Sequence, residues 1–156
     1  MRTFFFLILV SLPALGQSTC AFTKERIECV KYLHNYDGDT VTFKLPVAHP
    51  LYGDKAKVRV LGIDTAEMKP GKKASPCEKE WAKVAKAFVA AELSKAKKIN
   101  LTQLAGLDSF GRILAAVEYD DKDLKTLLLK DNLAVPYLGK KKVRVDWCEI
   151  KNKRKS

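Results

Sequence analysis

The chain has 156 residues, which is the length of one compact domain and excludes a chain of several. Lys and Arg total 29 against 18 Asp and Glu, so the formal net charge is +11. This excess favours nucleic acid, anionic lipid or acidic polymers as partners, although a basic, well-solvated surface can also serve only to keep an exported protein soluble.

The first 16 residues have the features of a secretory signal peptide. Arg2 precedes an apolar run from Phe4 to Val10, and the small-residue pattern Ala14-Leu15-Gly16 follows. A membrane anchor is the alternative, but the apolar run is shorter than the roughly 20 residues of a spanning helix. We therefore expect an exported protein, periplasmic or secreted, that keeps no membrane anchor after cleavage. The mature domain then runs from residue 17 to 150, before a basic tail at 151–156.

All four cysteines follow this leader: Cys20, Cys29, Cys77 and Cys148. An even number of cysteines in an exported chain predicts disulfides, and four allow three pairings. We favour Cys20 with Cys29, and Cys77 with Cys148, because the second bond would tie the start of a helix to the C-terminal segment. Zinc is the competing interpretation, but the chain has no CxxC pair and neither histidine lies at ligand spacing to a cysteine.

The first half of the mature chain reads as three strands, at 26–35, 39–45 and 55–63. Turns that contain Asp-Gly or Pro and Gly separate these segments. An antiparallel meander follows from this arrangement.

A helix is predicted next, because Ser75 and Glu78 form an S-x-x-E capping box with Pro76 at the first helical position. Apolar residues then recur near helical spacing from Trp81 to Leu93, with Ala85 and Phe88 between them. This helix has one core face.

Two further strands, at 97–104 and 112–119, flank the turn AGLDSFG, and a second helix is predicted over 121–134 with Leu124, Leu127 and Leu128 inward. Strands and helices in this order indicate an α+β fold, a five-stranded β-barrel of the oligonucleotide-binding type with two to three helices. The first helix lies between strands three and four.

Acidic residues gather where two of these strands meet turns. Asp-Gly at 37–38 is typical of a hairpin turn, but such a turn does not require a second aspartate at position 39. Asp39, Asp64 and Glu67 together would concentrate negative charge at the end of the third strand. Hard cations such as Ca²⁺ or Mg²⁺ relieve such repulsion through oxygen ligands, and a salt-bridge network to lysines is the alternative.

Two arginines belong to the same pattern. Strand alternation places Arg59 on the face opposite Val58 and Val60, and Arg112 opens the strand that follows Gly111. Each arginine alone is typical of a surface or a salt bridge. Two guanidinium groups beside a carboxylate-bound metal instead suit a phosphodiester, whose transition state gains negative charge.

From Tyr36 to Tyr137 the chain resembles the staphylococcal-nuclease-like (thermonuclease) family. YDGDTVTF, VRVLGIDTAE, DSFGRILAAV and the helix ending NLAVPY carry the resemblance, in the family's order and at compatible spacing. The resemblance implies an oligonucleotide-binding barrel that cleaves DNA and RNA with Ca²⁺.

The family's acidic motifs imply that Asp39, Asp64 and the backbone carbonyl of Thr65 bind the calcium ion. The glutamate that ends the second motif, Glu67 here, is implied to be the general base. Ala66 stands where the family usually has proline, which would have fixed φ at that position.

The family's arginines imply that Arg59 and Arg112 hold the phosphate. Phe110 replaces a tyrosine in the family's turn and Ser109 replaces a lysine, so a hydroxyl and a charge near the nucleotide are absent. Phe110 and Tyr137 are the predicted substrate-binding residues, with Tyr137 available to stack on a base.

The resulting hypothesis is a monomeric, Ca²⁺-dependent endonuclease that cleaves DNA and RNA, single-stranded or locally melted, and leaves 3′-phosphates. Lysines such as Lys72, Lys73 and those at 140–142 would attract phosphates, and a merely solvated surface is the alternative for each. The main alternative is a catalytically inactive nucleic-acid-binding barrel, and a basic protein that binds envelope polymers is a third.

Overall fold

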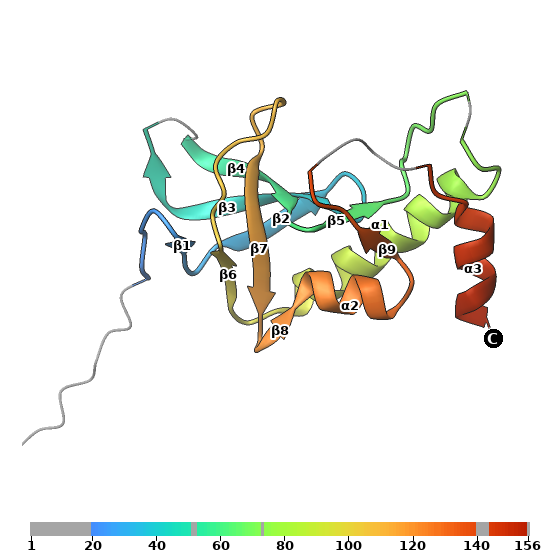
Figure 1. Ribbon diagram of the computed structural model, residues 1–156. Helices are drawn as coiled ribbons and strands as arrows, with labels where there is room; N and C mark the ends of the chain where they lie inside the picture. Colours follow the sequence, from blue (N-terminus) through green and yellow to red (C-terminus); the bar gives the residue numbers. More distant parts are fainter. Residues whose placement is uncertain (1–19, 51–52, 73, 140–143, 156) are drawn as a thin grey trace, which may run out of the picture.

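The computed structural model describes residues 20–50, 53–72, 74–139 and 144–155 (Figure 1). The predicted signal peptide lies outside the described residues. Within them, no helix combines the length and the apolar character needed to cross a membrane.

Nine strand segments and three helices make up the described part of the chain. The strands are β1 (Arg26–Ile27), β2 (Lys31–Asn35), β3 (Thr40–His49), β4 (Gly53–Val60), β5 (Ile63–Thr65), β6 (Ile99–Thr102), β7 (Ile113–Tyr119), β8 (Lys122–Asp123) and β9 (Ala134–Pro136). The helices are α1 (Glu78–Lys95), α2 (Leu124–Lys130) and α3 (Trp147–Lys155).

The main sheet has the order β1-β6-β7-β4-β3-β2, with β8 paired to β7. β2, β3 and β4 form the predicted antiparallel meander, and β7 then joins β4 in parallel, with Val58 opposite Ile113. β5 and β9 pair separately. The predicted fold class is confirmed: the architecture is α+β of the oligonucleotide-binding type, with α1 between β5 and β6 (Figure 1).

Two strands that the sequence predicts as continuous are interrupted by residues with left-handed backbone conformation. Cys29 has φ +57° and separates β1 from β2, so that β1 pairs with β6 instead of extending the meander. Gly62 has φ +82° and ends the long third strand at Val60, after which the chain resumes as β5. Alternating hydrophobicity does not report such a conformation, which glycine adopts most readily.

Helix α1 packs the predicted face into the core, where Trp81, Ala85 and Leu93 are buried, while Phe88 is only partly buried. The predicted capping box is wrong. The residue before the helix is Cys77, which makes no side-chain cap hydrogen bond, and the helix begins at Glu78. The Cys77 sulfur forms a disulfide with Cys148, which fixes the start of the helix covalently.

Helix α2 has a conventional polar start. The Asp123 carboxylate accepts hydrogen bonds from the backbone N–H groups of Lys125 and Thr126. Leu124 and Leu128 are fully buried, and Leu127 packs partly buried against the core. The inward face predicted for this helix is confirmed.

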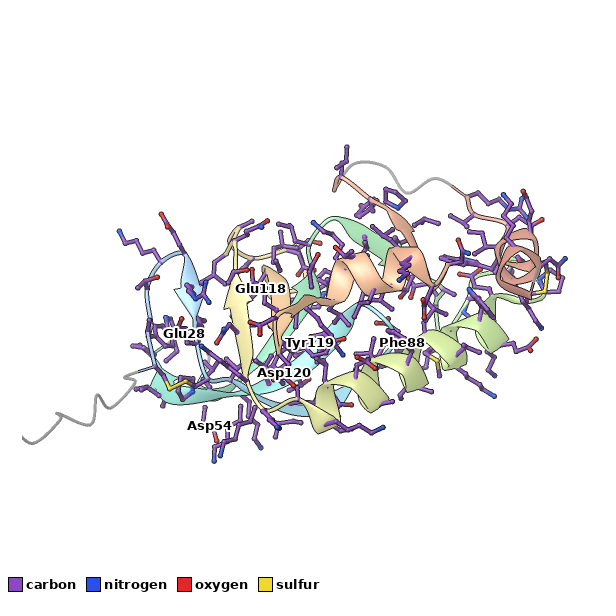
Figure 2. The ribbon with its side chains drawn as sticks, turned by 90° about the horizontal axis from the view of Figure 1, so that it is seen from below. Glu28, Asp54, Phe88, Glu118, Tyr119 and Asp120 are labelled. Carbon is purple, nitrogen blue, oxygen red and sulfur yellow. A yellow bond between two sulfur atoms is a disulfide. The ribbon has the colours of Figure 1, made fainter. Side chains whose placement is uncertain are left out.

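Both predicted disulfides form, Cys20–Cys29 and Cys77–Cys148. They lie at opposite ends of the molecule, the first beside the sheet and the second between α1 and α3 (Figure 2). The segment expected as a solvated tail is helical as far as Lys155. Lys151 in this helix forms an ion pair of 2.6 Å with Glu80 in α1.

Candidate active site

The turn between β2 and β3 is built by its own first carboxylate. Asp37 Oδ1 accepts hydrogen bonds from the backbone N–H of Asp39 at 3.1 Å and of Thr40 at 2.8 Å. A Cβ at Gly38 would lie 2.8 Å from Thr65 Cγ2 and 2.9 Å from Ala85 Cβ. Only glycine lets the turn pack this closely on β5 and α1.

Burial, and secondly the charge of Asp39, raise the pKa of Asp37 to about 7. The carboxyl group therefore lies in a site where a further negative charge is costly. A metal cation or a guanidinium group next to these carboxyl groups would therefore have a strongly favourable interaction energy.

A buried asparagine anchors the turn to α1. Asn35 Nδ2 donates to the carbonyl oxygens of Asp37 at 2.7 Å and Lys86 at 3.0 Å, while its Oδ1 accepts from the Tyr32 hydroxyl at 2.6 Å. Sequence reasoning missed Asn35. Its signal was a polar residue at the end of a strand directly before an Asp-Gly turn.

The Asp39 carboxylate joins the turn to β5. Its Oδ2 accepts from the Thr65 backbone N–H at 2.8 Å and from Thr65 Oγ1 at 2.9 Å, and its Oδ1 accepts from Thr40 Oγ1 at 3.1 Å. Asp39 is 1% exposed, so these bonds form away from water. The structure thus brings together Asp39 and Thr65, which the sequence predicts in one site.

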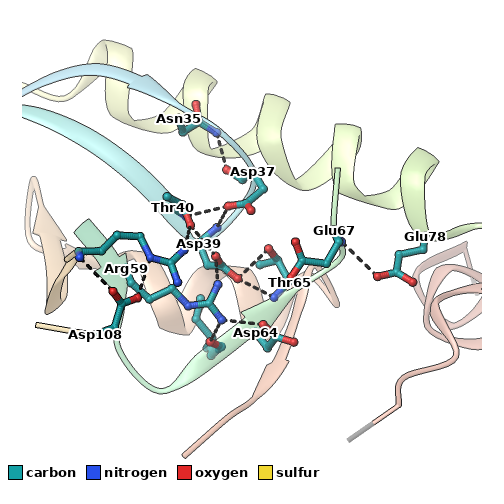
Figure 3. A network of polar contacts seen from close by, with 12 residues as sticks. Asn35, Asp37, Asp39, Thr40, Arg59, Asp64, Thr65, Glu67, Glu78 and Asp108 are labelled. Carbon is teal, nitrogen blue, oxygen red and sulfur yellow. Dashed lines mark hydrogen bonds and ion pairs between the residues drawn. The ribbon is translucent and has the colours of Figure 1, made fainter. Parts of the chain in front are cut away.

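Arg59 lies between the two predicted metal carboxylates (Figure 3). Its Nη1 forms an ion pair with Asp39 Oδ1, and its Nη2 lies 2.6 Å from Asp64 Oδ1 and 3.3 Å from the Ile63 carbonyl oxygen. Burial alone would lower the pKa of Arg59, but the Asp39 and Asp64 carboxylates raise it. The guanidinium therefore stays charged and neutralises both acids.

The oxygen donors here fit a hard cation. Asp39 and Asp64 converge on a single guanidinium, so two carboxylates already face a common position, and Ca²⁺ takes carboxylate and backbone carbonyl oxygens. Among the described residues, no group of three or more His, Cys, Asp or Glu side chains is arranged to hold a metal ion. A calcium ion at this position would therefore need further oxygen ligands beyond these two carboxylates.

Glu67 lies in the segment between β5 and α1, two residues after Thr65. It is partly exposed, and its backbone N–H donates to Glu78 Oε1 at 3.3 Å. Ala66 is fully buried in the core, so the residue that replaces the family's proline fills a packed position.

Arg112 is oriented by the loop that precedes β7. Asp108 Oδ1 accepts from the backbone N–H groups of Phe110 and Arg112, both at 2.9 Å, and Asp108 Oδ2 lies 2.7 Å from Arg112 Nε. Gly111, with φ +74°, closes this loop. Arg112 Nη1 then donates to Thr40 Oγ1 at 3.0 Å, which connects it to the Asp39 network.

Asp108 is a second residue that sequence reasoning missed, although it lies inside a quoted motif. Burial favours a higher pKa for its carboxyl, but hydrogen bonds from the Arg112 backbone N–H and side chain lower the pKa overall. Its spacing of four residues before Arg112 was the available signal.

The two predicted substrate-binding aromatic residues differ in exposure. Phe110 is 81% exposed at the loop tip, and the Arg112 guanidinium carbon lies 5.2 Å from its ring centroid. Tyr137 is partly buried, and its backbone N–H donates to the Gly62 carbonyl oxygen at 3.0 Å, beside the β4–β5 turn. Lys72 is exposed, whereas Lys73 and Lys140–Lys142 lie outside the described residues.

A family model described as staphylococcal nuclease homologue (SNase) matches residues 57–153. The chain belongs to this family. No match was found among the curated proteins. The SNase match includes Arg59, Asp64, Glu67 and Arg112 but begins beyond Asp39, which the fold brings to Arg59 and Thr65.

The SNase family is of the nuclease and phosphodiesterase type, generally uses Ca²⁺ and acts on nucleic acids. The two disulfides suit an exported protein. The donors and guanidinium groups around Asp39 are of the chemical kind that such an activity requires.

Proposed function

We propose that this SNase-family protein is a periplasmic or secreted, Ca²⁺-dependent endonuclease that hydrolyses phosphodiester bonds in both DNA and RNA and leaves 3′-phosphate ends. One observation supports this most. Asp39 and Asp64 share the guanidinium of Arg59, and the Thr40 hydroxyl links Asp39 to Arg112. Two carboxylates and two arginines from separate parts of the chain thereby form one polar network.

In this proposal Asp39, Asp64 and the Thr65 carbonyl would hold Ca²⁺, whose positive charge would favour both the binding of the phosphate and the deprotonation of a water molecule. Glu67 takes the proton from that water. Arg59 and Arg112 bind the phosphate and stabilise the negative charge that grows on its oxygens as the 5′-oxygen leaves.

Arg59 has to exchange partners for this role. Its Nη1 and Nη2 are engaged with Asp39 and Asp64, so a two-pronged grip on a phosphate requires these ion pairs to loosen, which neutralisation of the two carboxylates by another cation would favour. The ionic state of the two acids and the availability of Arg59 are therefore coupled. Arg112 can keep its bonds to Asp108 through Nε and to Thr40 through Nη1 and still offer the remaining N–H donors of its guanidinium to a phosphate.

The proposed substrate is single-stranded or locally melted nucleic acid, cleaved by a monomer. A barrel of this type follows one strand through a basic groove, and exposed aromatic side chains such as Phe110 can stack on bases. Binding should therefore weaken steeply as the salt concentration rises.

The test is cleavage of single-stranded DNA and RNA by the mature protein with Ca²⁺, with Mg²⁺ or with a chelator. Glu67→Gln should lose a factor on the order of 10²–10⁴ in rate, because the amide cannot accept the proton. Glu25→Gln, at an exposed position in the N-terminal segment, is the matched control and should cleave normally. Equal rates for both variants would overturn the assignment of Glu67.

The Arg59 ion pairs also favour a second candidate, a catalytically inactive barrel that binds nucleic acid. In such a protein Arg59 would remain locked between Asp39 and Asp64 and hold the fold together. Tight, salt-sensitive binding without cleavage at any Ca²⁺ concentration would support that alternative.

A further inference from the structure

The start of α1 is in contact with the proposed general base. Glu78 is the first residue of the helix, and its Oε1 accepts a hydrogen bond from the backbone N–H of Glu67 at 3.3 Å (Figure 3). Ala66, the residue before Glu67, is fully buried. Glu67 is thus held on one side by core packing and on the other by the first turn of α1.

This first turn is fixed covalently. Helix starts are usually secured by a Ser, Thr, Asp or Asn side chain, but Cys77 makes no cap hydrogen bond. Its sulfur is bonded to Cys148 in α3, and Ser75 Oγ lies 3.4 Å from the Cys148 sulfur. The disulfide therefore restrains the position of the helix start, and of Glu78 with it, through a covalent bond to α3.

Helix α3 is itself anchored to the rest of the fold. Trp147, the neighbour of Cys148, is 3% exposed within the core, and Lys151 pairs with Glu80 in α1 at 2.6 Å. The Cys148 end of the disulfide thus belongs to a firmly packed element. A continuous connection runs from this packed helix through Cys77 and Glu78 to the backbone of Glu67.

We propose that Glu78, secured by the Cys77–Cys148 disulfide, is a positioning residue for Glu67. The inference rests on the proposed function, since it assumes that Glu67 takes a proton from water. Neither Glu78 nor the disulfide contacts Arg59 or Arg112 through any bond described above. Loss of this connection should therefore lower kcat and leave the KM for the nucleic acid nearly unchanged.

Glu78→Ala and the double variant Cys77→Ser/Cys148→Ser should each lower kcat by about tenfold to hundredfold, with KM within about twofold of its original value. Glu78→Gln keeps an acceptor oxygen and should retain most of the activity. The matched control is Cys20→Ser/Cys29→Ser, which removes the disulfide at the other end of the molecule (Figure 2) and should leave kcat unchanged. All assays are run well below the melting temperature of each variant.

A double-mutant cycle distinguishes positioning from general loss of structure. If Glu78 acts through Glu67, then Glu78→Ala should have almost no further effect on the rate in a Glu67→Gln background. The same loss in both backgrounds would overturn the inference.

Amide hydrogen exchange tests the inference without catalysis. The Glu67 amide should exchange faster in Glu78→Ala and in Cys77→Ser/Cys148→Ser than in the unaltered protein or the Cys20→Ser/Cys29→Ser control. If the unaltered protein does not cleave nucleic acid, the proposed function fails. Hydrogen exchange still tests whether Glu78 and the disulfide restrain the Glu67 amide. Unchanged exchange of the Glu67 amide in both variants would overturn the inference.

Discussion

Arg112 Nη1 donates a hydrogen bond to Thr40 Oγ1 at 3.0 Å, although 72 residues separate them along the chain. The sheet register produces this approach. Thr40 lies opposite Arg59 on β4, and Arg59 lies opposite Leu114 on β7. Three neighbouring strands thus bring the hairpin, the central arginine and the loop of Arg112 to one edge of the fold.

Thr40→Val should separate the two halves of this network. Valine has a similar shape but cannot donate to Asp39 or accept from Arg112, so we expect a loss of about 1–2 kcal/mol in unfolding free energy and about tenfold in cleavage rate. Thr40→Ser retains the hydroxyl and is the control. Urea unfolding and cleavage assays measure both effects, and equal rates for the two variants would show that the hydroxyl is dispensable.

Arg59→Met should destabilise the protein by about 3–5 kcal/mol, because it leaves the buried carboxylates of Asp39 and Asp64 without their shared cation. Added Ca²⁺ should then raise the melting temperature of the variant more than that of the unaltered protein. Thermal unfolding with Ca²⁺ and with a chelator is the measurement.

The control for this experiment is Arg26→Met. The Arg26 side chain is 40% exposed where it pairs with Glu28, so its removal should cost at most about 1 kcal/mol and should not alter the response to Ca²⁺. Arg59→Lys keeps the charge but not the planar fork and should also impair cleavage. A Ca²⁺ response that is the same with and without Arg59 would contradict a cation site at Asp39 and Asp64.

Gly38→Ala should destabilise the hairpin turn by about 1–3 kcal/mol, since its methyl group would overlap Thr65 Cγ2 and Ala85 Cβ. Cleavage should fall as well, because Thr65 binds Asp39 through both its backbone and its hydroxyl. Gly71→Ala, where a Cβ meets nothing within 4 Å, is the matched control. Denaturant midpoints compare them, and similar midpoints would mean that the turn adjusts at little cost.

Asp108→Asn should flatten the pH dependence of stability in acid. The pKa of Asp108 is lowered in the folded state, so ionisation of this carboxyl stabilises the fold. The stabilisation is fully present when the pH is above the ordinary pKa of an aspartate, which is about 4. This contribution disappears as the pH falls through the lowered pKa. Melting temperatures measured between about pH 2 and pH 5 should therefore fall less for Asp108→Asn than for the unaltered protein, and parallel curves would contradict the prediction.

Much of the fold follows from local patterns. Alternation along the strands and the helical spacing from Trp81 to Leu93 were sufficient to predict the meander and α1. The four cysteines predicted two disulfides but allowed three pairings, of which the structure has the one that we favoured. The interruptions at Cys29 and Gly62 were not predictable. Alternation of apolar and polar residues shows which face of a strand a residue occupies, but it does not show whether its φ is positive. The predicted capping box was wrong because the helix begins at Glu78, so Ser75 is not at the N-cap position and the Glu78 carboxylate accepts from the Glu67 backbone N–H.

The sequence by itself determined which residues carry charge near the end of the third strand: Asp39, Arg59, Asp64, Glu67 and Arg112. Only the tertiary structure decided how they pair. Gly62 turns the chain back so that Asp64 meets Arg59, and the hairpin delivers Asp39 to the same guanidinium. Asn35 gains its role from its bond to the Lys86 carbonyl in α1, which exists only once strand and helix are packed. The contacts of Asp108 with Phe110 and Arg112 are local by comparison. An ion pair depends on distance and burial, and neither is a property of local sequence.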